Sequence, residues 1–445
     1  VPVLIALAAL SWFATRDEPD RPIDFGEWDW VLITDFDNRT GENVLEGTVE
    51  YALQRELNNS RFVKVVPRDR INAALAMMKR PPDTRIDGEV GRELSLRDGG
   101  IRMLVTGRIE KLGNRYLVGT DLLNPSDGVT LASFAREAEG QEDILGKVGE
   151  LAREVREALG ESLASIEESE AALLKATTPS LEALRLYSEA DRLMRTPERP
   201  KAAGLLEQAV RIDPEFASAY LLLVYLYRDA GDPVKTQAAL EQAVGLADQT
   251  TERERLFILA TYYRYLDDPQ REIETYELLV RLYPDHGWAR GNLAHLLSWQ
   301  GRFDEAAPYF AELAEQSPND LFNQFTAAQS LSFVGMDDEA RAFLDRTEAL
   351  NPFPWLRAQI TVLPAVVAWA QRDVTASREF TDALVENMEP ETLLAQQELF
   401  TQVRSLYLAT GQLERLRQMS GLRSGLGWFD AMMDWSMGNQ DTLLT

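Results

Sequence analysis

Three prolines in the second half of the chain lie at equal intervals. Pro284, Pro318 and Pro352 are 34 residues apart, and each follows a segment with the apolar periodicity of an α-helix. Proline ends a helix because it lacks an amide hydrogen and its ring clashes with the preceding turn. A fixed interval of this length predicts stacked helix-turn-helix units that bury their apolar faces against one another.

This interval is the period of the tetratricopeptide repeat, so we expect an all-α tetratricopeptide-repeat superhelix over residues 180–445. Counting back from the prolines gives repeats at 183–216, 217–250, 253–286, 287–320 and 321–354, with looser helical pairs after them. Gly231, Gly301 and Gly335 fall between the two helices of a unit, where a turn favours glycine because positive φ costs it little. Repeats of this kind form a binding surface rather than a catalytic pocket.

The segment 28–176 has a different pattern and predicts a small α/β domain with a mixed sheet. The expected elements are a strand at 30–36, a helix at 44–58, a strand at 61–67, helices beginning near Asp69 and Val90, strands at 103–111, 115–123 and 130–138, and a long helix at 142–176 that Gly160 could interrupt. Their order is βαβααβββα.

The first fifteen residues are apolar and uncharged, and charged residues begin at Arg16. A membrane-spanning helix needs about 20 such residues, so we interpret residues 1–15 as the truncated end of a transmembrane helix, followed by a linker over 16–27. Trp12 and Phe13 suit the membrane interface. The alternatives are the apolar part of a signal peptide or a buried helix.

The chain is strongly acidic, with 46 Lys and Arg against 72 Asp and Glu and a formal charge of −26. A nucleic-acid partner is not expected, because such proteins present a basic surface. The acidity keeps the protein soluble or suits a cationic ligand. No cysteine is present, so disulfides, thiolate nucleophiles and Cys-ligated zinc are excluded.

Catalytic chemistry has little support in these residues. The two histidines, His286 and His295, have no metal-binding spacing, and we expect no catalytic, cofactor-binding or metal-binding residue. Asp35 and Asp37 follow a predicted strand, where catalytic acids can occur, but Asn38 after them favours a capped turn. A soluble enzyme is therefore the least supported of the functional hypotheses.

Several segments resemble a known bacterial arrangement. Residues 32–41 (Leu-Ile-Thr-Asp-Phe-Asp-Asn-Arg-Thr-Gly) resemble the opening of the TolB-like amino-terminal domain, and further resemblance lies at 66–68, 104–109, 159–166 and 176–188. The whole arrangement is similar to the extracytoplasmic half of bacterial transmembrane serine/threonine kinases that carry tetratricopeptide repeats. Transmembrane transcription regulators and adenylate cyclases can have similar halves.

The resemblance implies a non-catalytic sensor region of a single-pass inner-membrane receptor, with this region in the periplasm. The Gly-rich loop, the strand lysine and the His-Arg-Asp and Asp-Phe-Gly motifs of a kinase are absent from this sequence, so a kinase domain would lie before Val1. The expected partner is a protein or peptide, and formation of a homo-oligomer is left open. The alternative is a free-standing periplasmic scaffold that assembles envelope proteins.

In tetratricopeptide units the second, fifth, ninth, twelfth and thirteenth residues usually line the concave groove. The matching residues that we expect to bind a protein are Tyr225, Arg228, Arg264, Trp288, His295, Trp299, Phe322, Phe325 and Gln329, with Phe257, Tyr265 and Phe333 on the same helix faces. Aromatic and Arg side chains are common hot-spot residues of protein interfaces. The alternative is that many of these aromatic side chains form the core between repeats.

Overall fold

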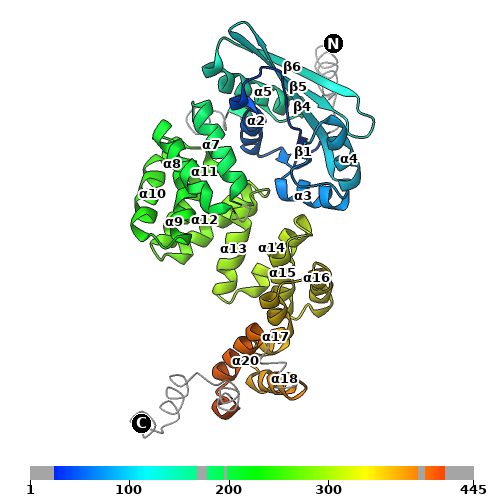
Figure 1. The fold of residues 1–445 in the computed structure, drawn as a ribbon, viewed down its shortest axis with the longest axis vertical. Helices are drawn as coiled ribbons and strands as arrows, with labels where there is room; N and C mark the ends of the chain where they lie inside the picture. Colours follow the sequence, from blue (N-terminus) through cyan, green and yellow to red (C-terminus); the bar gives the residue numbers. More distant parts are fainter. Residues whose placement is uncertain (1–24, 168–177, 195–197, 389–395, 416–445) are drawn as a thin grey trace, which may run out of the picture. The chain divides into compact units, whose positions relative to one another are not determined.

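The computed structural model describes residues 25–167, 178–194, 198–388 and 396–415 (Figure 1). The predicted membrane helix at 1–15 and most of the linker lie outside the described residues. Among the described helices, none has both the length and the apolar character needed to cross a membrane. The chain divides into two compact units, residues 1–289 and 290–445.

The first unit begins with the α/β domain, whose predicted element order is confirmed. Its elements are β1 (Trp30–Ile33), β2 (Asp37–Asn38), α2 (Thr48–Asn58), β3 (Lys64–Val65), α3 (Arg68–Met77), α4 (Gly88–Asp98), β4 (Ile101–Leu112), β5 (Arg115–Leu123), β6 (Thr130–Ala138) and α5 (Ile144–Ala158). The two-residue strand β2 is an addition to the predicted order. The helix predicted at 142–176 is interrupted near Gly160, as the sequence suggested: α5 ends at Ala158, Gly160 has a φ of 96°, and residues 163–167 are helical again. Residues 168–176 of the predicted helix lie outside the described residues.

The sheet of this domain is mixed, as predicted. Its strands lie in the order β3-β1-β4-β5-β6, and β2 also pairs with β4. Strand β1 is parallel to both β3 and β4, whereas β4, β5 and β6 are antiparallel neighbours. Gly113 in the first hairpin turn and Gly128 in the second have φ values of 66° and 76°, which glycine adopts at little cost.

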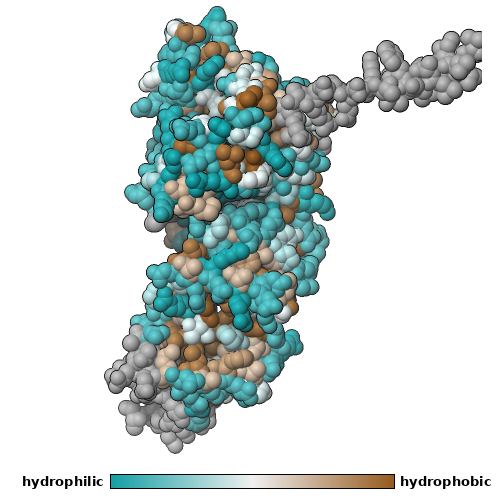
Figure 2. Space-filling view, turned by 90° about the vertical axis from the view of Figure 1, so that its right-hand side faces the viewer, coloured by the Kyte–Doolittle hydropathy of each residue, from teal (hydrophilic) through white to brown (hydrophobic). Residues whose placement is uncertain are grey.

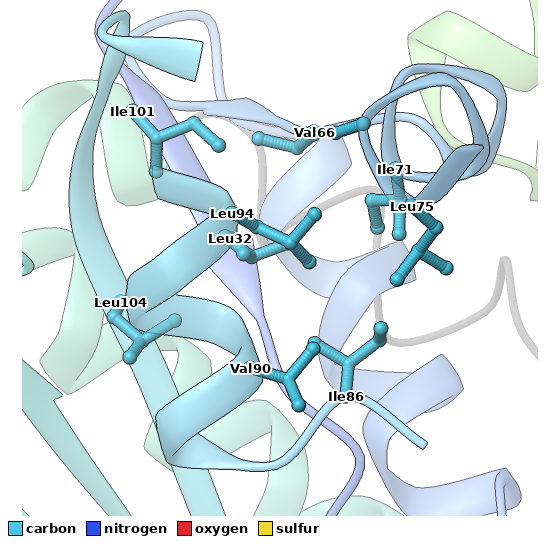
Figure 3. Close-up of a cluster of buried hydrophobic side chains, with 10 residues drawn as sticks. Leu32, Val66, Ile71, Leu75, Ile86, Val90, Leu94, Ile101 and Leu104 are labelled. Carbon is cyan, nitrogen blue, oxygen red and sulfur yellow. The ribbon is translucent and has the colours of Figure 1, made fainter. Parts of the chain in front are cut away.

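Helices cover both faces of this sheet. Helices α3 and α4 lie on one face, where Leu32 of β1 and Leu104 of β4 pack with Leu75 and Leu94 (Figure 3). Helix α5 packs on β5 and β6 and beside α2. Side chains alternate along a strand, so Val31, next to Leu32, faces the other layer and is also fully buried. Burial on both faces explains the nearly continuous apolar run of β1.

The rest of the first unit consists of paired helices. They are α7 (Leu181–Leu193), α8 (Ala202–Ile212), α9 (Ala217–Asp229), α10 (Pro233–Leu246), α11 (Glu252–Tyr265), α12 (Pro269–Leu282) and the start of α13 (Gly287–Trp299). Consecutive helices pack pairwise as α7 with α8, α9 with α10, and α11 with α12. This arrangement is the helix-turn-helix pairing of a tetratricopeptide superhelix, and it confirms the predicted fold class.

The second unit continues the same pattern from within α13. Its further helices are α14 (Phe303–Gln316), α15 (Leu321–Phe333), α16 (Asp337–Ala349), α17 (Pro354–Ala370), α18 (Val374–Glu386) and α20 (Gln397–Ala409). Helix α13 begins at Gly287 and α15 at Leu321, which are 34 positions apart, as predicted. Beyond the five predicted repeats, α17 pairs with α18, and Val362 of α17 packs with Val403 and Tyr407 of α20.

The repeat prolines act through the residue before each of them. Ser317, which precedes Pro318, has φ −130° and ψ 66°, and Tyr283, which precedes Pro284, has φ −134° and ψ 73°. Both residues have left the helical region, as steric contact with a following proline ring requires. The last hydrogen-bonded turn therefore ends one residue before the proline, and the chain turns into the next repeat.

Candidate protein-binding surfaces of the repeats

Helix α2 of the α/β domain contacts the first helices of three consecutive repeats, α7, α9 and α11. Arg55 is the centre of this contact. Its guanidinium lies 5.1 Å from the ring centroid of Tyr187 and 5.9 Å from that of Phe216. Its Nη2 donates to Ser218 Oγ at 3.2 Å and also binds the Glu254 carboxylate, and Ser218 Oγ donates to the same carboxylate at 2.7 Å.

Further polar contacts surround Arg55. Tyr51 of α2 donates its hydroxyl hydrogen to Asp191 Oδ2 at 3.3 Å. Arg253 of α11 donates from Nη1 to the backbone oxygen of Asn58 at 2.9 Å, and Arg61 Nη2 donates to Glu252 Oε2 at 2.5 Å. These contacts join the α/β domain to the first three repeats within a single compact unit.

The electrostatics of this contact favour a charged arginine. Burial by itself would lower the pKa of Arg55, but the surrounding Tyr187, Tyr51 and acidic groups raise it above its ordinary value. Burial and the neighbouring Asp191 raise the pKa of Tyr51 well above its ordinary value, so its hydroxyl stays protonated and can donate. The contact therefore consists of a buried cation held between aromatic rings and carboxylates.

The repeat residues in this contact occupy groove positions. Tyr187 and Asp191 are the fifth and ninth residues of the first expected repeat, whereas Ser218 and Glu254 are the second residues of the next two repeats. None of these four residues was among those predicted from the sequence. The groove positions of tetratricopeptide units would have included all four residues if we had applied them to the first repeat and to the second residue of every repeat. Their partner, Arg55, carried no sequence signal because it is 199 positions from Glu254.

The groove residues predicted in the first unit have different environments. Tyr225 is buried, its hydroxyl is 3.0 Å from Thr261 Oγ1, and its ring lies 6.1 Å from that of Trp288. Arg264 donates from Nε to the buried Glu272 Oε1 at 2.7 Å, so its charge is neutralised within the fold. Arg228 is exposed. Burial thus places the Tyr225 side chain in the core rather than on an open groove surface.

The predicted residues of the second unit also divide by exposure. Trp299 is 75% exposed, and the exposed His295 lies between it and Phe310, with ring centroids 6.3 Å and 4.9 Å away. Phe325 is buried with Leu356 and therefore belongs to the core. Gln329 is half-buried. The predicted role of this set in protein binding stays a prediction.

Phe322 of α15 is part of an exposed aromatic cluster that we call the aromatic trio, with Phe353 and Trp355 at the start of α17. The three side chains are 54%, 40% and 43% exposed. The rings of Phe353 and Trp355 are stacked at 6.2 Å and 12°, and Phe322 is tilted against them at 5.7 and 6.4 Å. Three exposed aromatic rings in mutual contact form an apolar surface of the kind that binding partners cover.

Phe353 and Trp355 were not predicted from the sequence, although a signal for Trp355 existed. Trp288, Phe322 and Trp355 are each the second residue of their helices, α13, α15 and α17. An aromatic residue thus recurs at this position in three successive repeats. The face of the molecule drawn in Figure 2 is mostly hydrophilic with scattered apolar patches.

Metal binding has no candidate site in the described part of the chain, because no three His, Asp or Glu side chains there are grouped as ligands.

Comparisons with known proteins give partial structural likenesses only. No protein-family model and no curated protein matches the chain. The pilus biogenesis factor PilW is 19% identical over 46% of this chain and 93% of its own, with a TM-score of 0.33. YrrB, described as a tetratricopeptide protein with an unusual peptide-binding site, is 21% identical over 43% of this chain and 93% of its own, with a TM-score of 0.26.

The carboxyl-terminal domain of LpoB from Salmonella enterica is 14% identical over 26% of this chain and 86% of its own, with a TM-score of 0.24. At these scores, none of the likenesses supports a statement about what this chain binds. None of the three proteins is described as a TolB-like domain or a receptor kinase, so that resemblance stays a prediction. The fold is a mixed α/β domain followed by a run of paired helices typical of a tetratricopeptide superhelix.

Proposed function

We propose that this chain is a protein-interaction scaffold that binds an extended peptide segment at the aromatic trio. The supporting observation is the exposure of Phe322, Phe353 and Trp355 as one contact cluster. Two of them are second residues of helices, a position that lines the groove in tetratricopeptide units. Large aromatic rings contribute much contact area at a low cost in side-chain entropy, which makes them effective anchors for a peptide.

The charge of the chain indicates the chemistry of that peptide. The protein carries a formal charge of −26, so long-range attraction favours a basic segment. An arginine or lysine side chain could lie against the face of Trp355, where a cation–aromatic contact contributes about 0.5–1 kcal/mol at an exposed site. We therefore expect the trio to select peptides that combine apolar side chains with Arg or Lys.

The first three repeats have a different role in this scaffold, which is to hold the α/β domain. Their groove positions contact α2 through Arg55, so they hold the α/β domain in place instead of binding a partner. The later repeats would then be the part of the superhelix whose groove positions stay open to a partner. Partner binding at the later repeats leaves this internal contact undisturbed.

We further propose that this scaffold is the extracytoplasmic part of an inner-membrane receptor, with a serine/threonine kinase before Val1. The support is the uncharged apolar segment 1–15 and the resemblance of residues 32–41 to TolB-like domains. Membrane fractionation of the full-length gene product should place it in the inner membrane. Recovery of a soluble periplasmic protein with a cleaved amino terminus would instead identify the free-standing scaffold.

The binding proposal can be tested with peptides of random sequence. A random peptide library is selected against the purified chain, and the affinities of the enriched peptides are measured by calorimetry. Trp355→Ala should weaken binding by roughly 30-fold, corresponding to about 2 kcal/mol for a hot-spot truncation. The matched control is Trp369→Ala, which removes another exposed tryptophan of α17 (48% exposed) and should change affinity less than about twofold. Equal losses in both variants, or none in Trp355→Ala, would reject the trio as the binding site.

A further inference from the structure

A hollow lies within the first unit, between α10 and the carboxyl end of α11. Its volume is about 850 Å³, which is in the size range of small-molecule sites. The uncharged part of its lining includes Leu240, Val244 and Gly245 of α10 with Tyr262, Tyr265 and Leu266 at the end of α11. A ligand in this hollow would therefore make much of its contact with aliphatic and aromatic side chains.

The fold leaves part of this lining uncovered. The side chain of Leu266 is 51% exposed, and that of Tyr265 is 39% exposed. Gly245 of α10 has no side chain, and nothing lies within 4 Å of a Cβ added there. An apolar group that enters the hollow gains free energy because it displaces water from these side chains.

The charges in and beside the hollow are negative in sum. The charged side chains of the lining are Arg228, Asp232 and Glu241. Arg228 donates from Nε and Nη2 to Asp229 Oδ1 at 3.2 and 3.0 Å, and Asp229 also pairs with Arg199 Nη2 at 2.5 Å. These two guanidinium groups and three carboxylates together carry a net negative charge, which favours a cationic ligand over an anionic one.

The two carboxylates of the lining differ in what they offer to a ligand. Asp232 caps α10, where it accepts from the amide of Lys235 at 3.0 Å and lies at the positive end of the helix dipole. Glu241 is exposed about 13 Å further along the helix axis and accepts from the uncharged side chain of Gln237 at 2.9 Å. No cationic side chain of the described residues pairs with Glu241, so its carboxylate can pair with a cation from outside.

We propose that this hollow binds a small amine with an apolar body. The body lies against Leu240 and the exposed side chains of Tyr265 and Leu266, and the ammonium group pairs with the carboxylate of Glu241. The tyrosine rings of the lining add a surface on which an aromatic body can stack. This site is separate from the aromatic trio, and neither proposal depends on the other.

The test uses three probes that share one ring and differ in charge. They are tryptamine, which is cationic at neutral pH, the uncharged indole and the anionic indole-3-acetate, each titrated into the full chain by calorimetry. Tryptamine should bind most tightly and indole-3-acetate most weakly. Gly245→Leu should fill the hollow and weaken tryptamine and indole roughly tenfold, and it should stay folded because leucine favours a helix more than glycine does.

A charge variant tests the ammonium contact. Glu241→Gln should weaken tryptamine about threefold, the effect of one exposed ion pair, and leave indole unchanged. The matched control is Glu274→Gln in α12, because Glu274 is equally exposed, accepts from Gln270 in the same way and does not line the hollow. Gly204→Leu in α8 is the control for Gly245→Leu, since Gly204 is as open and lies outside the lining. Neither control should change the affinity for any probe.

Several outcomes would overturn the proposal. They are the absence of saturable tryptamine binding, an affinity for indole-3-acetate as high as that for tryptamine, and equal tryptamine affinities of the native and Gly245→Leu proteins. Equal losses of tryptamine and indole in Glu241→Gln, or equal losses of tryptamine in Glu241→Gln and Glu274→Gln, would overturn the pairing with Glu241.

Discussion

Arg55 of α2 and Glu254 of α11 form an ion pair between residues that are 199 positions apart. Their side chains are only 13% and 17% exposed, so water screens the pair weakly. Removal of one partner leaves the other charge buried without compensation, which typically costs about 3–5 kcal/mol. The pair therefore couples the stability of the α/β domain to that of the repeats.

We predict that Arg55→Ala lowers the free energy of unfolding of the first unit by about 3 kcal/mol in urea denaturation. A double-mutant cycle with Glu254→Gln should give a coupling energy of about 1 kcal/mol or more. Arg115→Ala is the control, because its pair with Glu137 is more than half exposed on both sides and should contribute little. Additive effects of Arg55→Ala and Glu254→Gln would show that the two side chains act independently.

A second prediction concerns pH and Glu50 of α2. Burial, with the nearby Asp35 and Glu46 carboxylates, raises the pKa of Glu50 to about 8. Its Oε2 atom is buried and has no hydrogen-bond partner. Because the unfolded chain releases this proton near pH 4.3, the folded state binds more protons between roughly pH 4 and 8, and stability falls as pH rises through that window.

Glu50→Gln should therefore raise the free energy of unfolding at pH 9 by roughly 2 kcal/mol or more, with little change at pH 4. Denaturation curves of both proteins at the two pH values measure this difference. Asp121→Asn is a control on the exposed side of β5, where Asp121 accepts from Ser133. A gain in Glu50→Gln that is equal at both pH values would argue against a titrating Glu50.

A third prediction concerns the turn glycines of the second unit. Gly301 has a φ of 75°, and a Cβ added there would meet nothing within 4 Å. Gly301→Ala should therefore destabilise the unit by about 1 kcal/mol through backbone strain alone. Gly291→Ala in α13 is the counterpart, because its Cβ would make an ordinary contact at 3.8 Å with Leu313 and alanine favours the helix. Thermal melts should show a decrease for Gly301→Ala and an unchanged or increased midpoint for Gly291→Ala.

A fourth prediction separates surface from core among the predicted groove residues. Trp299 is 75% exposed, so Trp299→Ala should change the free energy of unfolding by less than about 0.5 kcal/mol. Phe325 is 6% exposed, and Phe325→Ala should cost about 3–5 kcal/mol. Chemical denaturation of the two variants measures both changes in the free energy of unfolding. A large loss of stability in Trp299→Ala would mean that this tryptophan is part of the core and cannot be free for a peptide.

The sequence predicted the local features of the fold well. The order of strands and helices in the α/β domain follows from periodicity and turn residues, which act over a few positions. The interval between Pro284 and Pro318 predicted the repeats for the same reason, because each proline fixes the backbone of the residue before it. Glycine at the inter-helix turns took positive φ as expected, although Asp267 fills that position in the third repeat with a φ of 53°.

The candidate site was less predictable because side-chain exposure depends on neighbouring elements. Tyr225 and Phe325 were selected because they occupy groove positions of their repeats, but packing against adjacent helices buries both. Positions within a repeat could not identify Arg55, which belongs to the α/β domain. Trp355 could have been found from its recurrence one repeat after Phe322, whereas the contact of Phe353 with both rings required the three-dimensional structure.

We expect a partner to bind at the later repeats while the first three repeats hold the α/β domain. Hydrogen–deuterium exchange of the full chain, with and without a selected peptide, can distinguish these two regions. Binding should slow exchange at the starts of α15 and α17, around residues 321–326 and 354–358, and leave α2, α7 and α9 unchanged. Slower exchange in α7 and α9 together with faster exchange in α2 would contradict the account, because the peptide would then have displaced α2 from the groove.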